Sequence, residues 1–146
     1  MFIQKIILTM ELTLKFSEIN WLSVVVAAVA AFAIGGLWYS PILFSRIWQR
    51  ELNLKDEDIR NSNMPLIFGL TFILNLVGAL TLDAVLGPDA TMSGGLALGL
   101  LVSIAWISTA LGINYLFARK SIKLFLIDAG YFVVFYAVMG IILGAW

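Results

Sequence analysis

Asn75, Asn114 and Asp128 are the residues of this chain whose types and positions could do chemistry, because each lies in an otherwise apolar stretch. Polar groups within a membrane span are the first candidates for function. Counted from the basic turn at residues 119–123, Asn114 and Asp128 lie at similar depths on consecutive helices. An asparagine amide can donate to a carboxylate, so we predict that Asn114 donates a hydrogen bond to Asp128.

This polar pair has two interpretations. In the first, Asp128 is an embedded ionisable site that responds to a proton or a cation. In the second, which we favour, it is a structural clamp. If Leu124 marks the interface, Asp128 lies only about 6 Å deep at a rise of 1.5 Å per residue. Water, Lys120 or Lys123 could reach a carboxylate at that depth.

The composition gives little support to catalytic, cofactor or metal sites. Cysteine and histidine are both absent, which removes thiol and imidazole chemistry and the usual zinc and haem ligands. The acidic run Asp56, Glu57 and Asp58 could hold a metal, but Lys55 and Arg60 flank it, as on a solvated face. Nine basic residues balance nine acidic ones, so a nucleic-acid partner is not expected. We expect no cofactor and no enzymatic activity.

The stretches that position these residues predict an all-α integral membrane protein. The chain is 62% hydrophobic and 12% charged, whereas soluble domains are about 45–50% apolar and about 25% charged. Four stretches are long enough for a helix of about 20 residues to cross the bilayer: residues 19–45, 61–82, 90–118 and 124–146, the last interrupted by Asp128. We predict a bundle of four transmembrane helices, at about 20–39, 65–85, 92–117 and 124–145, in one domain at 19–146.

Two short interfacial helices are also expected. Pro41 favours the first position of a helix that Ser40 would cap, followed by a polar loop at 49–63. Residues 1–18 form either an amphipathic surface helix or a flexible or misassigned start with Met10 as the initiator, and the sequence leaves both open. The predicted interfacial motif comprises Trp38, Tyr39, Ser40, Pro41, Phe44 and Trp48.

Small residues recur at intervals of four, a spacing that lets helices pack closely in lipid. We interpret these stripes as packing within the chain, with homo-oligomerisation as the alternative. They comprise Ala27, Ala31 and Gly35, then Gly95, Gly99 and Ser103, and finally Gly140 and Gly144.

The distribution of lysine and arginine predicts the orientation. The two loops that follow the first and third spans carry seven of these residues, against Lys5 and Lys15 in the N-terminal segment. Because basic loops stay in the cytoplasm, we expect both of these loops there and both termini outside.

Several blocks in order resemble a known family. They are Asn20-Trp21, then Trp38-Tyr39-Ser40-Pro41 with Phe44 and Trp48, then 113–117, 121–131 and the C-terminal 139–146. In these blocks the chain is similar to the small bacterial membrane proteins grouped as domain of unknown function 1761, over about residues 20–146. The resemblance implies four spans, a bacterial membrane and no assigned activity. We expect the cytoplasmic (inner) membrane.

Two functions therefore stand. The first is a non-enzymatic membrane protein with a structural, scaffold or accessory role, with membrane lipids and a homo-oligomer or larger membrane complex as partners. The alternative is a small transporter or channel that uses Asp128. An interfacial enzyme with a metal at the acidic run ranks third.

Overall fold

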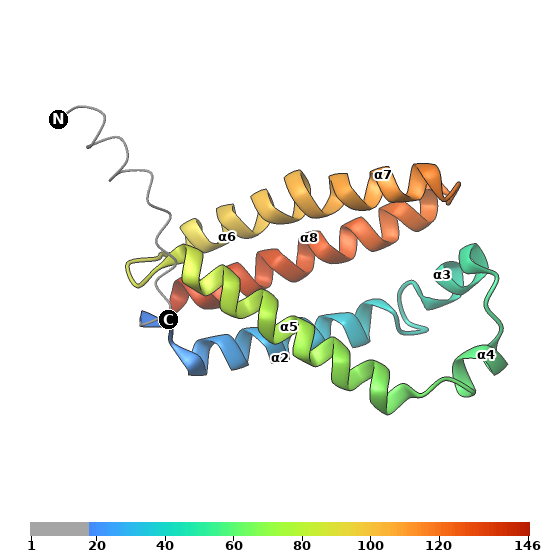
Figure 1. Cartoon of the computed structure of the whole chain (residues 1–146), viewed down its shortest axis with the longest axis horizontal. Coiled ribbons are helices and arrows are strands. Elements are labelled where there is room, and N and C mark those ends of the chain that lie inside the picture. The colour runs from blue at the N-terminus through green and yellow to red at the C-terminus, as the bar shows by residue number, and fades with distance from the viewer. Residues whose placement is uncertain (1–17) are drawn as a thin grey trace.

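Four long apolar helices make up most of the computed structural model, which describes residues 18–146 (Figure 1). They are α2 (Trp21–Trp38), α5 (Met64–Leu86), a third span over Met92–Phe117, and α8 (Ile122–Ala145). All four are long and apolar enough to cross a membrane. The predicted all-helical four-span fold is confirmed. The expectation of an amphipathic or flexible N-terminal segment falls almost entirely on residues 1–17, outside the described residues.

The third span is not a uniform α-helix. It consists of α6 (Met92–Leu101), the π-helical segment η2 (Val102–Ser108) and α7 (Thr109–Phe117). The wider π turn moves the backbone hydrogen bonds from i→i−4 to i→i−5. The Ser108 hydroxyl follows this longer spacing and donates to the Ser103 carbonyl oxygen at 2.7 Å.

Each span begins at a residue whose side chain caps the helix. Asn20, Asn63, Thr91 and Ser121 accept hydrogen bonds from backbone N–H groups in the first turns of α2, α5, α6 and α8. The first N–H groups of a helix have no partner within the helix, so such caps fix where it starts. At the other ends, Gly87 after α5 and Arg119 after α7 adopt positive φ angles of 72° and 53°.

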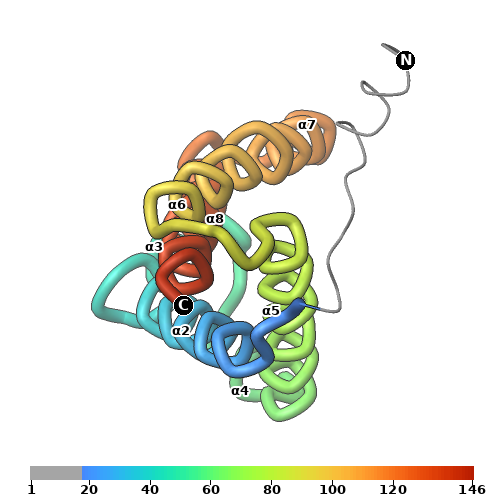
Figure 2. The backbone as a smooth tube through the Cα atoms, turned by 90° about the vertical axis from the view of Figure 1, so that its left-hand side faces the viewer, coloured from blue at the N-terminus to red at the C-terminus, as the bar shows by residue number. Residues whose placement is uncertain are grey.

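α8 lies at the centre of the bundle, with α2 and α6 against it (Figure 2). α2 contributes alanines that are fully buried, while α8 contributes aromatic and large aliphatic side chains. The buried core comprises Val24, Ala27, Ala28, Ala31, Ala79, Leu82, Tyr131, Phe135, Met139 and Leu143.

Glycines bring the backbones of α6 and α8 into direct contact. A Cβ atom on Gly95 would lie 1.9 Å from the Gly140 carbonyl oxygen, and one on Gly99 would lie 2.1 Å from the Tyr136 carbonyl oxygen. A Cβ atom on Gly144 would likewise lie 2.2 Å from the Thr91 carbonyl oxygen. Two of the predicted small-residue stripes therefore pack against each other within one chain.

The turn after α2 differs from the prediction. We expected Ser40 to cap a helix that starts at Pro41, but the next helix, α3 (Ser45–Leu52), starts four residues later. The Ser40 hydroxyl donates back to the Leu37 carbonyl, and the Ser40 carbonyl accepts from the Leu43 and Ser45 amides. These bonds close a turn over residues 40–45 before a helix can begin. The predicted loop at 49–63 also contains the end of α3 and the short helix α4 (Asp56–Arg60).

The two basic connections lie at one end of the bundle. Figure 1 shows α3, α4 and the α7–α8 turn at one end, and the α5–α6 turn with the C-terminus at the other. All seven lysines and arginines among residues 18–146 belong to the first end. They are Arg46, Arg50, Lys55, Arg60, Arg119, Lys120 and Lys123.

Replacing Gly99 by alanine should destabilise the bundle by about 1–3 kcal/mol, the usual cost of overpacking, because the new methyl group would collide with backbone of α8. Gly69 is the matched control, since a Cβ there meets nothing within 4 Å. Gly69→Ala should be neutral or stabilise by about 0.5–1 kcal/mol through its better helix propensity. Unfolding in a detergent titration measures both. Equal effects of the two substitutions would contradict the backbone contact.

Candidate intramembrane polar site

Asp128 is held by two tyrosines from different parts of the chain. Its side chain lies in the first half of α8 and the residue is 7% exposed. The Tyr39 hydroxyl donates to Oδ1 at 2.7 Å, and the Tyr115 hydroxyl donates to Oδ2 at 2.6 Å. Each carboxylate oxygen thus has its own donor, which is what a buried carboxylate requires.

Aromatic rings pack on one of these tyrosine donors. The Tyr39 ring lies 5.2 Å from the ring of Tyr131 and 5.4 Å from that of Trp48, both in edge-to-face arrangements. The Trp38 indole N–H donates to the Ile127 carbonyl at 3.1 Å, directly before Asp128 in the chain. The site is therefore a closed cluster built from α2, α3, α7 and α8.

The ends of two helices position the tyrosine hydroxyls. Tyr39 is the residue at which α2 ends, so its side chain projects from the last turn toward α8. Tyr115 lies on the last turns of α7, which closes with hydrogen bonds from the Arg119 and Lys120 amides to the carbonyls of Leu116 and Tyr115. Because this turn is short, α8 begins directly beside the end of α7, and Tyr115 and Asp128 contact each other across the turn.

A second polar contact docks α3 onto the same end of α8. The hydroxyl of Ser121, which caps α8, donates to the Glu51 carboxylate of α3. This contact holds α3 against α8, and with it the Trp48 ring that packs on Tyr39.

The pKa of Tyr39, which lies just past the end of α2, is raised above its ordinary value. Burial is the largest cause, followed by the hydrogen bond to Asp128 and the charge of Asp128. Tyr39 therefore stays protonated and remains a donor at every physiological pH.

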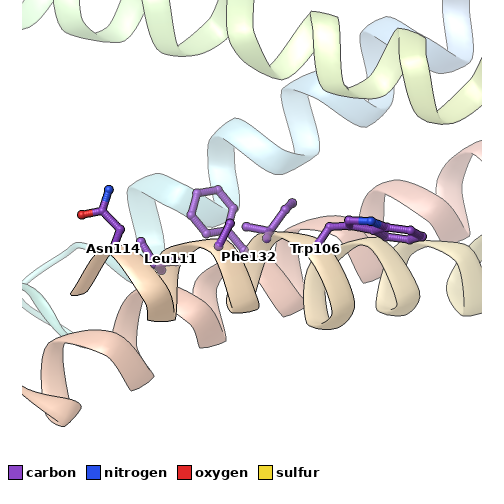
Figure 3. A pocket seen from close by; sticks show the side chains of 6 residues that line it. Trp106, Leu111, Asn114 and Phe132 are labelled. Carbon is purple, nitrogen blue, oxygen red and sulfur yellow. The ribbon is translucent and has the colours of Figure 1, made fainter. Parts of the chain in front are cut away.

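The predicted partner of Asp128 is wrong. Asn114 does not bond to Asp128; it is exposed on α7 and lines a groove with Leu111, Trp106 and Phe132 (Figure 3). Asn114 and Tyr115 are adjacent and so share the same depth, but neighbouring residues of a helix point about 100° apart. The sequence therefore predicted the depth of the donor correctly. The side chain that points toward Asp128 at that depth is Tyr115, and Asn114 points elsewhere.

Asn75 lies apart from this cluster. The residue is 5% exposed near the middle of α5, and its amide nitrogen has no hydrogen-bond partner among residues 18–146. The three predicted polar residues therefore have different environments. Asp128 is buried and hydrogen-bonded, Asn114 is exposed, and Asn75 is buried with an unpaired amide nitrogen.

Residues of the predicted interfacial motif contribute to this cluster. Trp38 and Tyr39 are both half-buried and hydrogen-bonded to α8. Phe44 packs on Trp38 with ring centres 4.8 Å apart. The block is therefore part of the polar site. The sequence signal that could have found it is the position of Tyr39 at the same end of the bundle as Asp128.

No group of three or more histidine, cysteine, aspartate or glutamate side chains in the described part of the chain lies close enough together to hold a metal ion. The acidic run of α4 caps its own helix instead, since the Asp58 carboxylate accepts from the Lys55 amide at 2.8 Å.

These features define a multi-pass membrane protein with a closed polar cluster near one end of the bundle. The chain belongs to the family described as "Protein of unknown function (DUF1761)", whose model matches residues 22–144. The predicted family is confirmed. No curated protein and no solved structure matches the chain.

Tyr39→Phe and Tyr115→Phe should each lower the free energy of unfolding by about 1 kcal/mol. This cost lies between the average for interhelical hydrogen bonds in membranes and the value for hydrogen bonds to charged groups. The double variant should lose more than the sum, because Asp128 then keeps neither donor. Detergent melting of the single and double variants measures this coupling. Tyr136→Phe is the control, since its hydroxyl makes no hydrogen bond within residues 18–146. Strict additivity would contradict the shared clamp.

Proposed function

We propose that this chain is a non-enzymatic protein of the bacterial inner membrane with a structural, scaffold or accessory role, and that Asp128 serves as its internal clamp. One observation carries the proposal: both Asp128 oxygens accept hydrogen bonds from tyrosines, inside a cluster closed by aromatic rings. A transport site needs access from one or both sides of the membrane. A carboxylate that is 7% exposed and fully engaged is better suited to joining helices.

The clamp joins segments that are far apart in the chain. Tyr39 and Asp128 are 89 residues apart, as are Trp38 and Ile127. The two contacts together fix the end of α2 against α8 at one depth. Such a fixed end suits a protein that presents a defined surface to a second copy or to a larger membrane complex.

A small transporter or channel is the second candidate, and Asp128 itself favours it. An ionisable residue in a span is a common feature of proton and ion pathways. For transport, the Tyr39 and Tyr115 bonds would have to open and close as Asp128 gains and loses a proton.

Asp128→Asn and Asp128→Leu separate the two functions. Asparagine keeps the shape and can still pair with both hydroxyls, so a clamp should tolerate it with a loss below about 1 kcal/mol. Leucine leaves two tyrosine hydroxyls unpaired and should cost about 1–3 kcal/mol. Detergent melting temperature measures stability, and growth of a deletion strain complemented with each variant measures function.

If the protein is a scaffold, each variant should complement the deletion strain to the extent that it remains stable. An asparagine variant that melts like the parent but does not complement would overturn it and establish Asp128 as a working ionisable group.

We further propose that the α3–α4 end of the bundle faces the cytoplasm. The seven lysines and arginines of residues 18–146 lie at that end, and basic residues in short loops are retained on the cytoplasmic side. Glu18, Asp83 and Asp89 lie toward the opposite end.

Single cysteines test this orientation, because the chain has none of its own. Asn61 after α4 and Asp89 in the α5–α6 turn are both exposed. In intact cells, an impermeant thiol reagent should label Asp89→Cys and should label Asn61→Cys only after the membrane is opened. The reverse pattern would show that the bundle is inserted the other way round.

A further inference from the structure

An apolar groove with one polar end runs along the third span. It is lined by Trp106, Ile107, Ala110, Leu111 and Asn114 from this span and by Phe132 from α8, with a cavity volume of about 430 Å³ (Figure 3). The five residues from the third span recur at intervals of one, three or four and so form one face of the helix. Trp106 is 61% exposed, so the groove opens on the surface of the bundle that meets lipid.

The groove exists because the third span separates from α8 along its length. Over α6, glycines place the two backbones in contact. Over α7, the Phe125 ring of α8 stands between the helices, 3.3 Å from where a Cβ of Gly112 would be. No residue of α7 is fully buried. The space therefore widens toward the basic end.

Asn114 is the polar end of the groove. It lies three residues before α7 ends at Phe117, about 4.5 Å below the helix end at 1.5 Å per residue. Such a position near the end of a span places the amide toward the membrane interface rather than the bilayer centre. Its side-chain amide makes no hydrogen bond within residues 18–146, so it is free to donate to an oxygen of a lipid headgroup.

The turn beyond Asn114 supplies positive charge. Arg119, Lys120 and Lys123 form no ion pair among the described residues. The two carboxylates at this turn are already hydrogen-bonded, Glu51 to Ser121 and Asp128 to Tyr39 and Tyr115, and neither pairs with the three cations. Arg119 also has a φ of 53°, a conformation that glycine adopts without strain and that arginine adopts at a cost.

We propose that this groove is a binding site for an anionic phospholipid. One acyl chain lies along Trp106, Ala110 and Phe132, the Asn114 amide donates to the ester or phosphate oxygens, and Arg119 and Lys120 bind the charged headgroup. Basic pockets between transmembrane helices are a known mode of anionic lipid recognition. The inference depends on the membrane-spanning fold alone, so it stands whether the protein is a scaffold or a transporter.

Native mass spectrometry of the full chain in a mild detergent tests the site, with phosphatidylglycerol and phosphatidylethanolamine added at equal concentration. The parent protein should retain phosphatidylglycerol in preference. Arg119→Gly/Lys120→Gln should bind it about 30-fold more weakly, as expected for two cations near the lipid surface. The glycine also relieves the backbone strain, so this variant should melt no lower than the parent and its loss of lipid cannot be due to unfolding.

Two further variants separate this groove from general attraction to the basic end. Lys55→Gln/Arg60→Gln removes the same charge from the region of α4 and should leave lipid retention unchanged. Ala110→Phe keeps every charge but fills the groove at an exposed position, and it should release the lipid. Equal retention of the two lipids by the parent, equal losses in the two charge variants, or unchanged binding in Ala110→Phe would each overturn the proposal.

Discussion

A carboxylate buried in an apolar helix is the constraint on which the arrangement of this bundle depends. Asp128 can stay at 7% exposure only if donors reach both of its oxygens. The donors come from the end of α2 and the end of α7, so satisfying one side chain fixes three helices at one depth. The indole of Trp38 adds a bond to the neighbouring backbone. The polar cluster thus specifies which ends meet, whereas apolar packing in lipid is less selective.

Different interactions hold the helices together at the two ends of the bundle. At the end with the α5–α6 turn, glycines allow the α6 and α8 backbones to touch, and dispersion forces dominate. At the basic end, side-chain hydrogen bonds and aromatic contacts join α2, α3, α7 and α8. Helices that are fixed by backbone contact at one end and by longer side chains at the other must diverge, and the groove along α7 is the space that this leaves.

The sequence predicted the four spans well because charge-free stretches and capping residues are local signals. It also identified Asp128 and the glycine stripes. It missed Tyr39 and Tyr115 because distance along a helix gives depth but not direction. Trp38 and Tyr39 were assigned to the interfacial motif from their residue types, which favour a depth in the membrane but do not predict which helix the side chain contacts. The Ser40-Pro41 segment was misread because backbone bonds to the Ser40 carbonyl close a turn over residues 40–45, and the next helix begins only at Ser45.

The π-helical segment of the third span has the form of a one-residue insertion. One extra residue per turn shifts everything that follows by about 100° around the helix axis. Before it, Gly95 and Gly99 face α8; after it, Tyr115 still reaches Asp128. A third span that was one residue shorter and of purely α geometry would direct a different residue at the carboxylate. Deleting one residue between Val102 and Ser108 would therefore exchange which side chain completes the clamp and which faces lipid, without changing the number of spans.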